Sequence, residues 1–357
     1  ARSVPLRLEQ PGRLVIDRSL PMVTVSAAGG QAKLHGGIEL WGETRGKVWL
    51  EVDGSVRLSL FESIDTDLVA SGLVSGLVEV SGTLGQPLFN GGAQVRDASA
   101  HHVGLGSTFD NIDADLRFAD GKVLVDQLSC QVGGGQLDLA GSMGIEGWAL
   151  GALALDLEAR DVALSPSRGI WGRFDAALEI AGHFDAPLVR GDVELISGVF
   201  SRPFDFERPL VERVRTVAPE ISATSFFNRV SLDLDVSAPE TVSVRNDMAL
   251  LDGEMRMQLL GSIARPRYVG QVRLIEGGRF TFRDIDYDLL SGQLLLDDER
   301  GLPPRVRLSA TTEVGDYEVQ LELDASSDSL DYRLSSTPAL PESAILMLLL
   351  TGQLGDD

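Results

Sequence analysis

The residue types that could support catalysis or metal binding are few in this sequence. It has four histidines and one cysteine among 357 residues. His101 and His102 are adjacent, and adjacent side chains on a strand point to opposite faces, so we interpret them as a polar pair at a strand end or in a loop. Cys130 is the single cysteine, which excludes an internal disulfide and any site built from several cysteines.

Two segments resemble ligand-binding loops but lack residues that the chemistry requires. The aspartates of RDIDYD (residues 283–288) are spaced like the first ligands of a calcium loop. Leucine, however, occupies position 289, where such a loop needs glycine, and position 295, where it needs glutamate. GETRGKV (residues 42–48) has too few residues between its glycines for a phosphate-binding loop, and valine follows its lysine. The sequence therefore predicts no catalytic residue, no metal site and no cofactor, and we do not expect an enzyme.

The charge of the chain restricts its partners. The net charge is −22 and the pI is near 4.5, whereas a nucleic-acid-binding surface needs clustered lysine and arginine. The longest apolar run, Ala344 to Leu350, is far shorter than the roughly 18 residues of a membrane-spanning helix. Because the chain begins at Ala1 without a charged leader, we expect an excised or processed part of a longer protein.

Most of the chain consists of segments in which apolar and polar residues alternate. Examples are residues 112–118 (IDADLRF), 153–159 (LALDLEA), 230–237 (VSLDLDVS) and 317–324 (YEVQLELD). Such alternation is typical of antiparallel strands with one buried face and one solvated face. The residues that we predict to share the apolar face are Leu116, Phe118, Leu155, Leu157, Leu232, Leu234, Val319, Leu321 and Leu323.

Three segments share the arrangement Gly-x4-Pro-x3-Gly, which predicts a repeated element. Their glycines and prolines are Gly82, Pro87 and Gly91; Gly182, Pro187 and Gly191; and Gly261, Pro266 and Gly270. Proline cannot donate to a strand ladder, so it belongs at a turn or a strand start. We therefore predict a β-hairpin in each copy, with its second strand ending at a small residue (Ala98, Gly198 or Gly277).

These strands predict an all-β fold built from one long antiparallel sheet. About 22 strands at a spacing of ~4.8 Å would extend on the order of 100 Å. A continuous apolar face of that length must be hidden, since soluble proteins rarely expose large apolar patches. We predict that the sheet curls along its length into a trough whose inner face is apolar.

Two segments break the alternation and predict one or two short helices. Residues 206–219 space their apolar positions as a helix does, and residues 341–352 begin with proline and end with glycine. The second segment offers a cap or partner-binding element through Leu340, Ile345, Leu346, Leu348 and Leu349. We predict one continuous architecture divided into a hairpin sheet (1–200), a helical insertion (201–220), a continuation of the sheet (221–335) and a C-terminal helix (336–357).

Two C-terminal stretches are more specific than the strand pattern. GGRFTFRDIDYDLLSGQLLLDD (residues 277–298), followed by LSSTPALPESAILMLLLTGQ (residues 334–353), resembles the C-terminal domain of the TamB family within the AsmA-like superfamily. The residues that carry the resemblance are Gly278, Arg279, Phe280, Phe282, Tyr287, Gly292, Pro338, Leu340, Pro341, Glu342, Ile345, Leu348, Leu349 and Gly352.

This resemblance implies a role in the biogenesis of the outer membrane of a Gram-negative bacterium. It implies a periplasmic protein, anchored in the inner membrane at full length, whose curled sheet carries phospholipid along an apolar groove. By the alternation described above, we expect the nine residues of the apolar face to line this groove. It implies an outer-membrane barrel partner of the TamA or BamA type. Two alternatives remain: a scaffold for β-barrel or autotransporter assembly that binds strands by β-augmentation, and, less favoured, a structural solenoid. On this resemblance we expect the sequence to be part of a longer protein, since it shows no N-terminal anchor and stops at Asp357, where members usually continue.

Overall fold

The structure is a computed structural model in which a defined part of the chain is described. The described residues are 13–16, 22–29, 32–39, 46–59, 68–102, 107–167, 169–201, 226–262, 265–282, 285–298, 302–326 and 329–351. Strand accounts for 82% of them and one short α-helix is present, which confirms the predicted all-β class. The helix predicted over residues 206–219 lies outside the described residues, as does most of the predicted insertion at 201–220.

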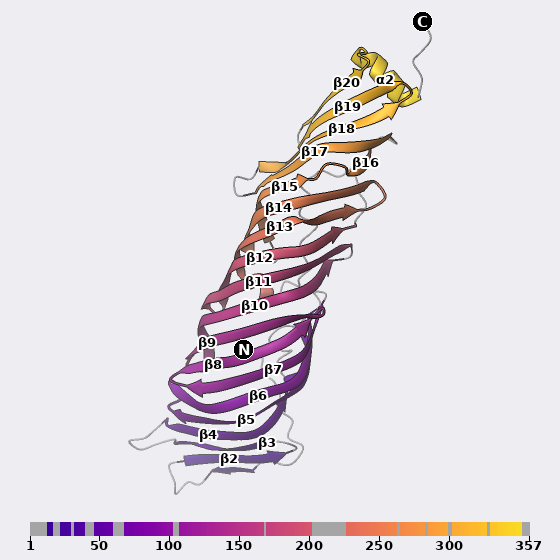
Figure 1. Ribbon diagram of the computed structural model, residues 1–357. Helices are drawn as coiled ribbons and strands as arrows, with labels where there is room; N and C mark the ends of the chain where they lie inside the picture. The colour runs from indigo at the N-terminus through magenta and orange to yellow at the C-terminus, as the bar shows by residue number, and fades with distance from the viewer. Residues whose placement is uncertain are drawn as a thin grey trace. The chain divides into compact units, whose positions relative to one another are not determined.

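The chain divides into two compact units, which we describe separately. Unit 1 consists of Ala1–Val162, Ala176–Arg190 and Ile221–Ser231, and unit 2 of Ala163–Asp175, Gly191–Glu220 and Leu232–Asp357. Each unit is built from antiparallel strands that pair with their neighbours in the chain (Figure 1).

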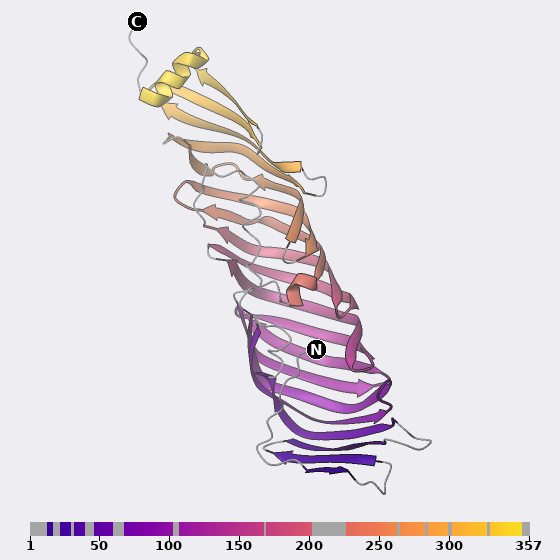
Figure 2. The ribbon, with the colours of Figure 1, turned by 180° about the vertical axis from the view of Figure 1, so that it is seen from behind.

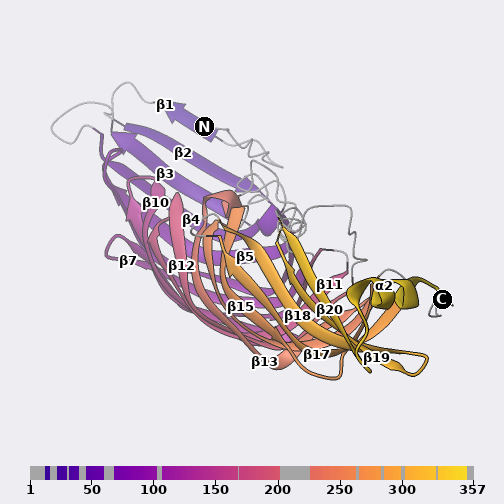
Figure 3. The same cartoon turned by 90° about the horizontal axis from the view of Figure 1, so that it is seen from above.

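Unit 1 is a ladder of long strands, which are visibly curved in the view of Figure 3. The first ten strands of the chain are β1 (Arg13–Ile16), β2 (Met22–Gly29), β3 (Ala32–Glu39), β4 (Val48–Arg57), β5 (Leu68–Gly82), β6 (Pro87–His102), β7 (Ser107–Ala119), β8 (Lys122–Val132), β9 (Gly135–Glu146) and β10 (Ala149–Ser167). Each pairs antiparallel with the next, from β1 to β10. Neighbours in sequence are thus neighbours in space, as short hairpin turns require.

Unit 2 holds most of the C-terminal strands and the α-helix, while residues 176–190 and 221–231 belong to unit 1. The remaining elements are β11 (Ile170–His183), β12 (Ala186–Phe200), the short 3-10 helix η3 (Phe226–Arg229), β13 (Ser231–Arg245), β14 (Ala249–Ser262), β15 (Arg265–Leu274), β16 (Arg279–Phe282), β17 (Ile285–Asp297), β18 (Leu302–Val314), β19 (Tyr317–Ala325), β20 (Leu330–Thr337) and α2 (Glu342–Thr351). β15 and β16 both lie between β14 and β17, so they act as one strand that is interrupted at residues 275–278.

The two glycines of the repeated hairpins adopt backbone conformations that other residues rarely take. The first glycine has φ between 90° and 96° in all three copies, and the last has φ of 120°, 136° and 152°. A Cβ on Gly82 would lie 2.6 Å from the carbonyl oxygen of Gln86, and a Cβ on Gly91 would lie 2.1 Å from that of Leu77. The first glycine therefore closes the turn, and the last lets two strands approach where a side chain would not fit.

We expect Gly82→Ala to destabilise unit 1 by about 1 to 3 kcal/mol, because it combines a left-handed backbone with a steric clash. Gly85→Ala in the same turn is the matched control. Gly85 has an ordinary φ, and an added Cβ would meet no atom within 4 Å. Urea denaturation followed by circular dichroism measures both variants, and equal midpoints would contradict the steric explanation.

The second strand of the first hairpin does not end where the sequence predicted. β6 continues past Ala98 to His102 through a bulge, because Asp97 adopts φ of 48° and the register shifts on both sides of Ala98. The Asp97 N–H donates to the Asp113 carboxylate at 3.1 Å, which satisfies a backbone group that the ladder leaves unpaired. Gly198 likewise lies inside β12. A small residue in these strands therefore marks a bulge or close packing, not a strand end.

Candidate functional site

The apolar face of unit 1 is built from side chains that lie directly opposite one another on neighbouring strands. Three rows cross β7 to β10: Phe118, Val123, Met143 and Leu153; Leu116, Val125, Gly141 and Leu155; and Ala114, Leu128, Leu139 and Leu157. Directly opposed residues point to the same face of a sheet. The register therefore brings together four of the predicted lining residues, Leu116, Phe118, Leu155 and Leu157.

This face is only partly covered. Leu153 and Leu155 on β10 are 8% and 7% exposed, whereas Leu116, Phe118 and Leu157 are half-buried. Along β10 the burial alternates residue by residue, with Asp156 and Glu158 exposed on the opposite face. Half-buried leucine and phenylalanine in the middle of a sheet leave apolar area that another apolar group can still cover.

The corresponding face of unit 2 is more completely closed. One row runs from β17 to β20 through Leu289, Ala310, Leu321 and Leu334. The first three of these are between 0% and 3% exposed, and the stacked rings of Phe280 and Tyr287 pack against the same cluster. Of the predicted lining residues of β19, Val319 and Leu321 are therefore core residues here, while Leu323 is half-buried.

The last two predicted lining residues lie on β13. Leu234 is 8% exposed and Leu232 is half-buried, and both alternate with exposed aspartates at 233 and 235. The residues on β7 and β10 belong to unit 1 and those on β13 and β19 to unit 2. The nine predicted residues thus lie on apolar faces, but they do not form one cluster within a single unit.

The predicted C-terminal helix is present as α2, beside β19 and β20 (Figure 1). Ile345 and Leu348 are 0% and 3% exposed and pack with Val319 of β19. Leu340 and Leu349 join this cluster as half-buried residues, and Leu346 is also half-buried. Met347 and Leu350 on the other side of the helix are 51% and 78% exposed. The helix therefore closes the end of the apolar face of unit 2 and presents a second apolar side to solvent.

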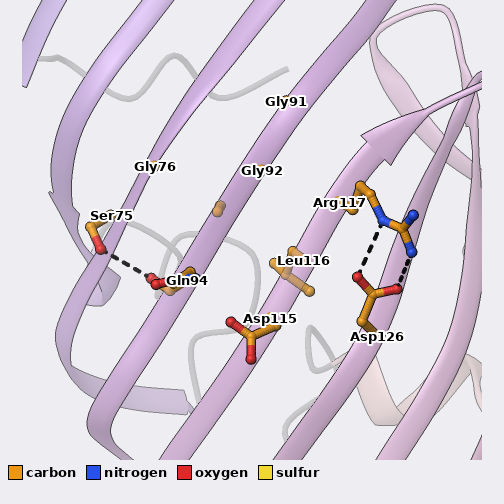
Figure 4. Close-up of a pocket in the computed structure, with 10 residues that line it drawn as sticks. Ser75, Gly76, Gly91, Gly92, Gln94, Asp115, Leu116, Arg117 and Asp126 are labelled. Atoms are coloured by element: carbon orange, nitrogen blue, oxygen red, sulfur yellow. Dashed lines mark hydrogen bonds and ion pairs between the residues drawn. The ribbon is translucent and has the colours of Figure 1, made fainter.

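The opposite, polar face carries ion pairs between neighbouring strands. In unit 1, Arg117 on β7 binds both carboxylate oxygens of Asp126 on β8, at 2.5 and 3.2 Å (Figure 4). In unit 2, Arg305 on β18 binds both oxygens of Asp324 on β19, each at 2.6 Å. These hydrogen bonds raise the pKa of both guanidinium groups and lower the pKa of the Asp324 carboxyl.

The depression in Figure 4 lies on this polar face. Ser75, Gln94 and the Arg117–Asp126 pair line it, together with the side-chain-free positions Gly91 and Gly92. Exposed ion pairs of this kind contribute little stability and offer no nucleophile or acid–base pair. We therefore assign the depression to the solvated surface and place the candidate site on the apolar face.

Asp286, Asp288 and His101, which the sequence analysis considered for chemistry, occupy ordinary strand positions, and Asp284 and residues 42–45 lie outside the described residues. Asp286 accepts a hydrogen bond from Thr281 at 2.6 Å and Asp288 pairs with Arg279 at 3.2 Å, as expected of a solvated strand face. His101 lies exposed on β6 with Thr108 at 3.4 Å. Within the described residues, no three His, Cys, Asp or Glu side chains are arranged to hold a metal ion.

Cys130 is a buried core residue of β8, and burial raises the pKa of its thiol to about 11, with a smaller contribution from Asp138. We expect iodoacetamide at pH 8 to alkylate it at least tenfold more slowly in the native protein than in urea, because the thiolate is the nucleophile. Rapid native alkylation would contradict the burial of this thiol.

The raised pKa of Cys130 also implies that the free energy of unfolding falls as the pH rises from about 9 towards 11. In this range the folded state retains a proton that the unfolded state loses.

In the described part of the chain, none of the helices could serve as a membrane span. The geometry defines a class of protein: an antiparallel-sheet protein in which the partly covered apolar face of β7 to β10 in unit 1 is available for binding, and in which the described residues form no catalytic or metal site. Residues 126–357 match the TamB C-terminal domain, and the chain belongs to the TamB family. This family acts in outer-membrane assembly and lipid transport, in the periplasm and envelope, with an outer-membrane partner. No curated protein and no solved structure matches the chain.

The residues that carried the resemblance are largely packing positions. A Cβ on Gly278 would lie 2.8 Å from the Leu251 side chain, and a Cβ on Gly292 would lie 2.7 Å from that of Leu274. Phe280 stacks on Tyr287 with ring centroids 5.5 Å apart. These residues therefore shape the interrupted strand β15–β16 and fill the apolar face where α2 closes it.

Proposed function

We propose that this chain is a non-enzymatic lipid-conduit module, which carries phospholipid acyl chains along an apolar groove between the inner and outer membranes. The observation that carries the proposal is the set of three apolar rows across β7 to β10. They are matched in register over four strands, they include half-buried leucines, and an ion-paired polar face lies behind them.

An apolar strip of this kind suits a sliding ligand. Burying a methylene group stabilises a complex by ~0.8 kcal/mol and has no directional requirement. A chain that moves one carbon along the strip exchanges one set of contacts for an equivalent set, so no deep minimum holds it. The polar head group would remain in water at the edge of the sheet. Family membership supports the periplasmic location, an inner-membrane anchor in the full-length protein and an outer-membrane barrel partner of the TamA or BamA type.

One observation favours a second candidate, a scaffold for barrel or autotransporter assembly. Among the described strands, β20 pairs only with β19. Leu330 and Tyr332 on β20 are 54% and 44% exposed, on the same face as Leu323. An edge strand with exposed apolar side chains can accept another strand by β-augmentation.

Photo-crosslinking separates the two candidates. A photoreactive residue placed at Leu157 or Leu323 should capture phospholipid from vesicles of phosphatidylethanolamine and phosphatidylglycerol. The matched controls at Glu158 and Glu322 lie next in sequence on the opposite face and should capture none. Equal capture from both faces, or none from either, would refute the conduit. Capture of a barrel protein from position 330 without lipid at 157 would favour the scaffold.

A further inference from the structure

The turn between β5 and β6 lies against the turn between β9 and β10, a contact that the sequence did not predict. Trp148 Nε1–H donates a hydrogen bond of 2.8 Å to the carbonyl oxygen of Leu84, 64 residues earlier. Strands β7 and β8 separate β6 from β9, so these two strands would be about 14 Å apart in a flat sheet. The end of the β5–β6 hairpin therefore bends along the edge of the sheet, past the ends of β7 and β8 (Figure 2).

Contacts on two sides hold this bent end, residues 81–90, which we call the strap. On the β4 side, the Leu84 N–H donates to the carbonyl oxygen of Gly46 at 3.0 Å, and a β-bridge joins Lys47 to Thr83. On the β10 side, the indole hydrogen bond is accompanied by an edge-to-face contact between Trp148 and Phe89. The ring centroids of that pair are 5.7 Å apart.

The strap is continuous with the apolar face. Phe89 lies opposite Val80, which is 5% exposed, and two residues further along β6 Gly91 lies opposite Phe118. The ring of Phe89 is therefore on the same face as the row that begins with Phe118. Trp148 is 55% exposed and Leu84 is 52% exposed, so apolar side chains continue from the protected face around the edge to solvent.

The contact on the β10 side is weak enough to open. It consists of one hydrogen bond from an exposed indole and one aromatic pair, which together favour the closed arrangement by a factor on the order of 100. The contacts on the β4 side are backbone hydrogen bonds and would persist when the other side separates. Opening would expose the edge of the apolar face at Phe118 and Val123.

We propose that the strap is a side door through which a phospholipid acyl chain enters the apolar face of unit 1. This inference rests on the proposed conduit function and adds the place of entry. The acyl chain passes between Leu84 and Trp148, while the head group stays in water at the edge of the sheet. The indole suits this position, because its ring is apolar and its N–H can return to a polar partner after passage.

A reversible lock tests the side door in a Cys130→Ser background. The double variant Gly85→Cys, Ala149→Cys is joined by a short bis-maleimide that contains a disulfide. Gly85 has room for a side chain, and Ala149 is exposed next to Trp148, which is retained. The readout is the rate at which a photoreactive residue at Leu157 captures phosphatidylglycerol from vesicles. We expect the lock to lower this rate at least tenfold and reduction of the linker to restore it.

The control applies the same reagent to Gly85→Cys, Lys47→Cys, which fastens the strap to the β4 side only and should leave the rate unchanged. If the locked protein captured lipid at the unlocked rate, the acyl chain would not enter between Leu84 and Trp148. That result would contradict the proposal that the strap opens to admit lipid. Absence of capture at Leu157 even without the lock would refute the conduit itself, and the inference with it. The two failures are therefore distinguishable.

Discussion

Ile345→Asp is expected to release α2 from the rest of unit 2 and to lower the free energy of unfolding of unit 2 by about 3 to 5 kcal/mol. The reason is that the variant places an unpaired charge at a fully buried position. Ile345 is 0% exposed and packs with Val319, also 0% exposed, and with Leu348. The loss cannot exceed the free energy with which the helix docks, since the helix can detach and solvate the aspartate. Burial of the Val319, Ile345 and Leu348 side chains, at about 1.5 to 3 kcal/mol each, sets that limit at about 4.5 to 9 kcal/mol. Hydrogen exchange of the β19 amides measures the effect.

Met347→Asp is the matched control for this variant. It introduces the same charge two residues further along the same helix, at a side chain that is 51% exposed. We expect its hydrogen exchange and urea midpoint to stay close to those of the unchanged protein, within about 0.5 kcal/mol. If both variants behaved alike, α2 would not be docked through the face that contains Ile345. An intact β19 in Ile345→Asp would show that the helix is a removable element and not part of the core.

The strands could be predicted because the pleat imposes a period of two on the sequence. Wherever one face is buried, as along residues 153–159, apolar and polar residues must alternate. The same period of two predicts which residues of each strand lie on the apolar face. Directly opposed residues share a face once the strands pair in chain order. The hairpin glycines were also recognisable, because a positive φ restricts the choice of residue at those positions.

The irregular features could not be predicted, because they depend on contacts between distant residues. The bulge at Asp97 depends on the carboxylate of Asp113 on the next strand, and the sequence shows only an aspartate within an alternating segment. The interruption at residues 275–278 lets β16 pair with the start of β14. The contact between Leu84 and Trp148 spans two intervening strands. Nothing in the alternation of either segment indicates it, and only the exposed tryptophan in a turn could have drawn attention.

The closure of unit 2 also exceeds what the period-two pattern can show. Alternation identifies Val319 and Leu321 as facing the apolar side, in the same way as it identifies Leu116 and Leu157. It does not reveal whether another element covers them. In unit 2, α2 and the Phe280–Tyr287 pair do so, whereas Leu116 of β7 and Leu157 of β10 remain half-buried. Burial of a face is a property of the packing between elements and leaves no trace within a single strand.

Leu116→Asp should obstruct lipid movement while leaving unit 1 folded. Leu116 is half-buried and lies between Ala93 and Val125 in the ladder, so a carboxylate there can reach water by a small shift of the side chain. We expect a loss of stability of about 1 to 3 kcal/mol, below that of Ile345→Asp. Lipid capture at Leu157 from phosphatidylglycerol vesicles should fall at least tenfold at pH 8, because an acyl chain that passes the carboxylate must strip water from it.

The pH dependence of this variant supplies the decisive comparison. Apolar neighbours raise the pKa of a carboxyl group, so the aspartate becomes neutral as the pH falls through that raised value. Capture by Leu116→Asp should therefore recover in part between pH 8 and pH 5, whereas Thr108→Asp, on the exposed face of the same strand, should capture lipid like the unchanged protein throughout. Recovery at low pH ties the defect to charge on the apolar face, since a packing defect would persist at every pH. Unimpaired capture by folded Leu116→Asp at pH 8 would mean that acyl chains do not pass along this row, and the conduit would have to lie elsewhere.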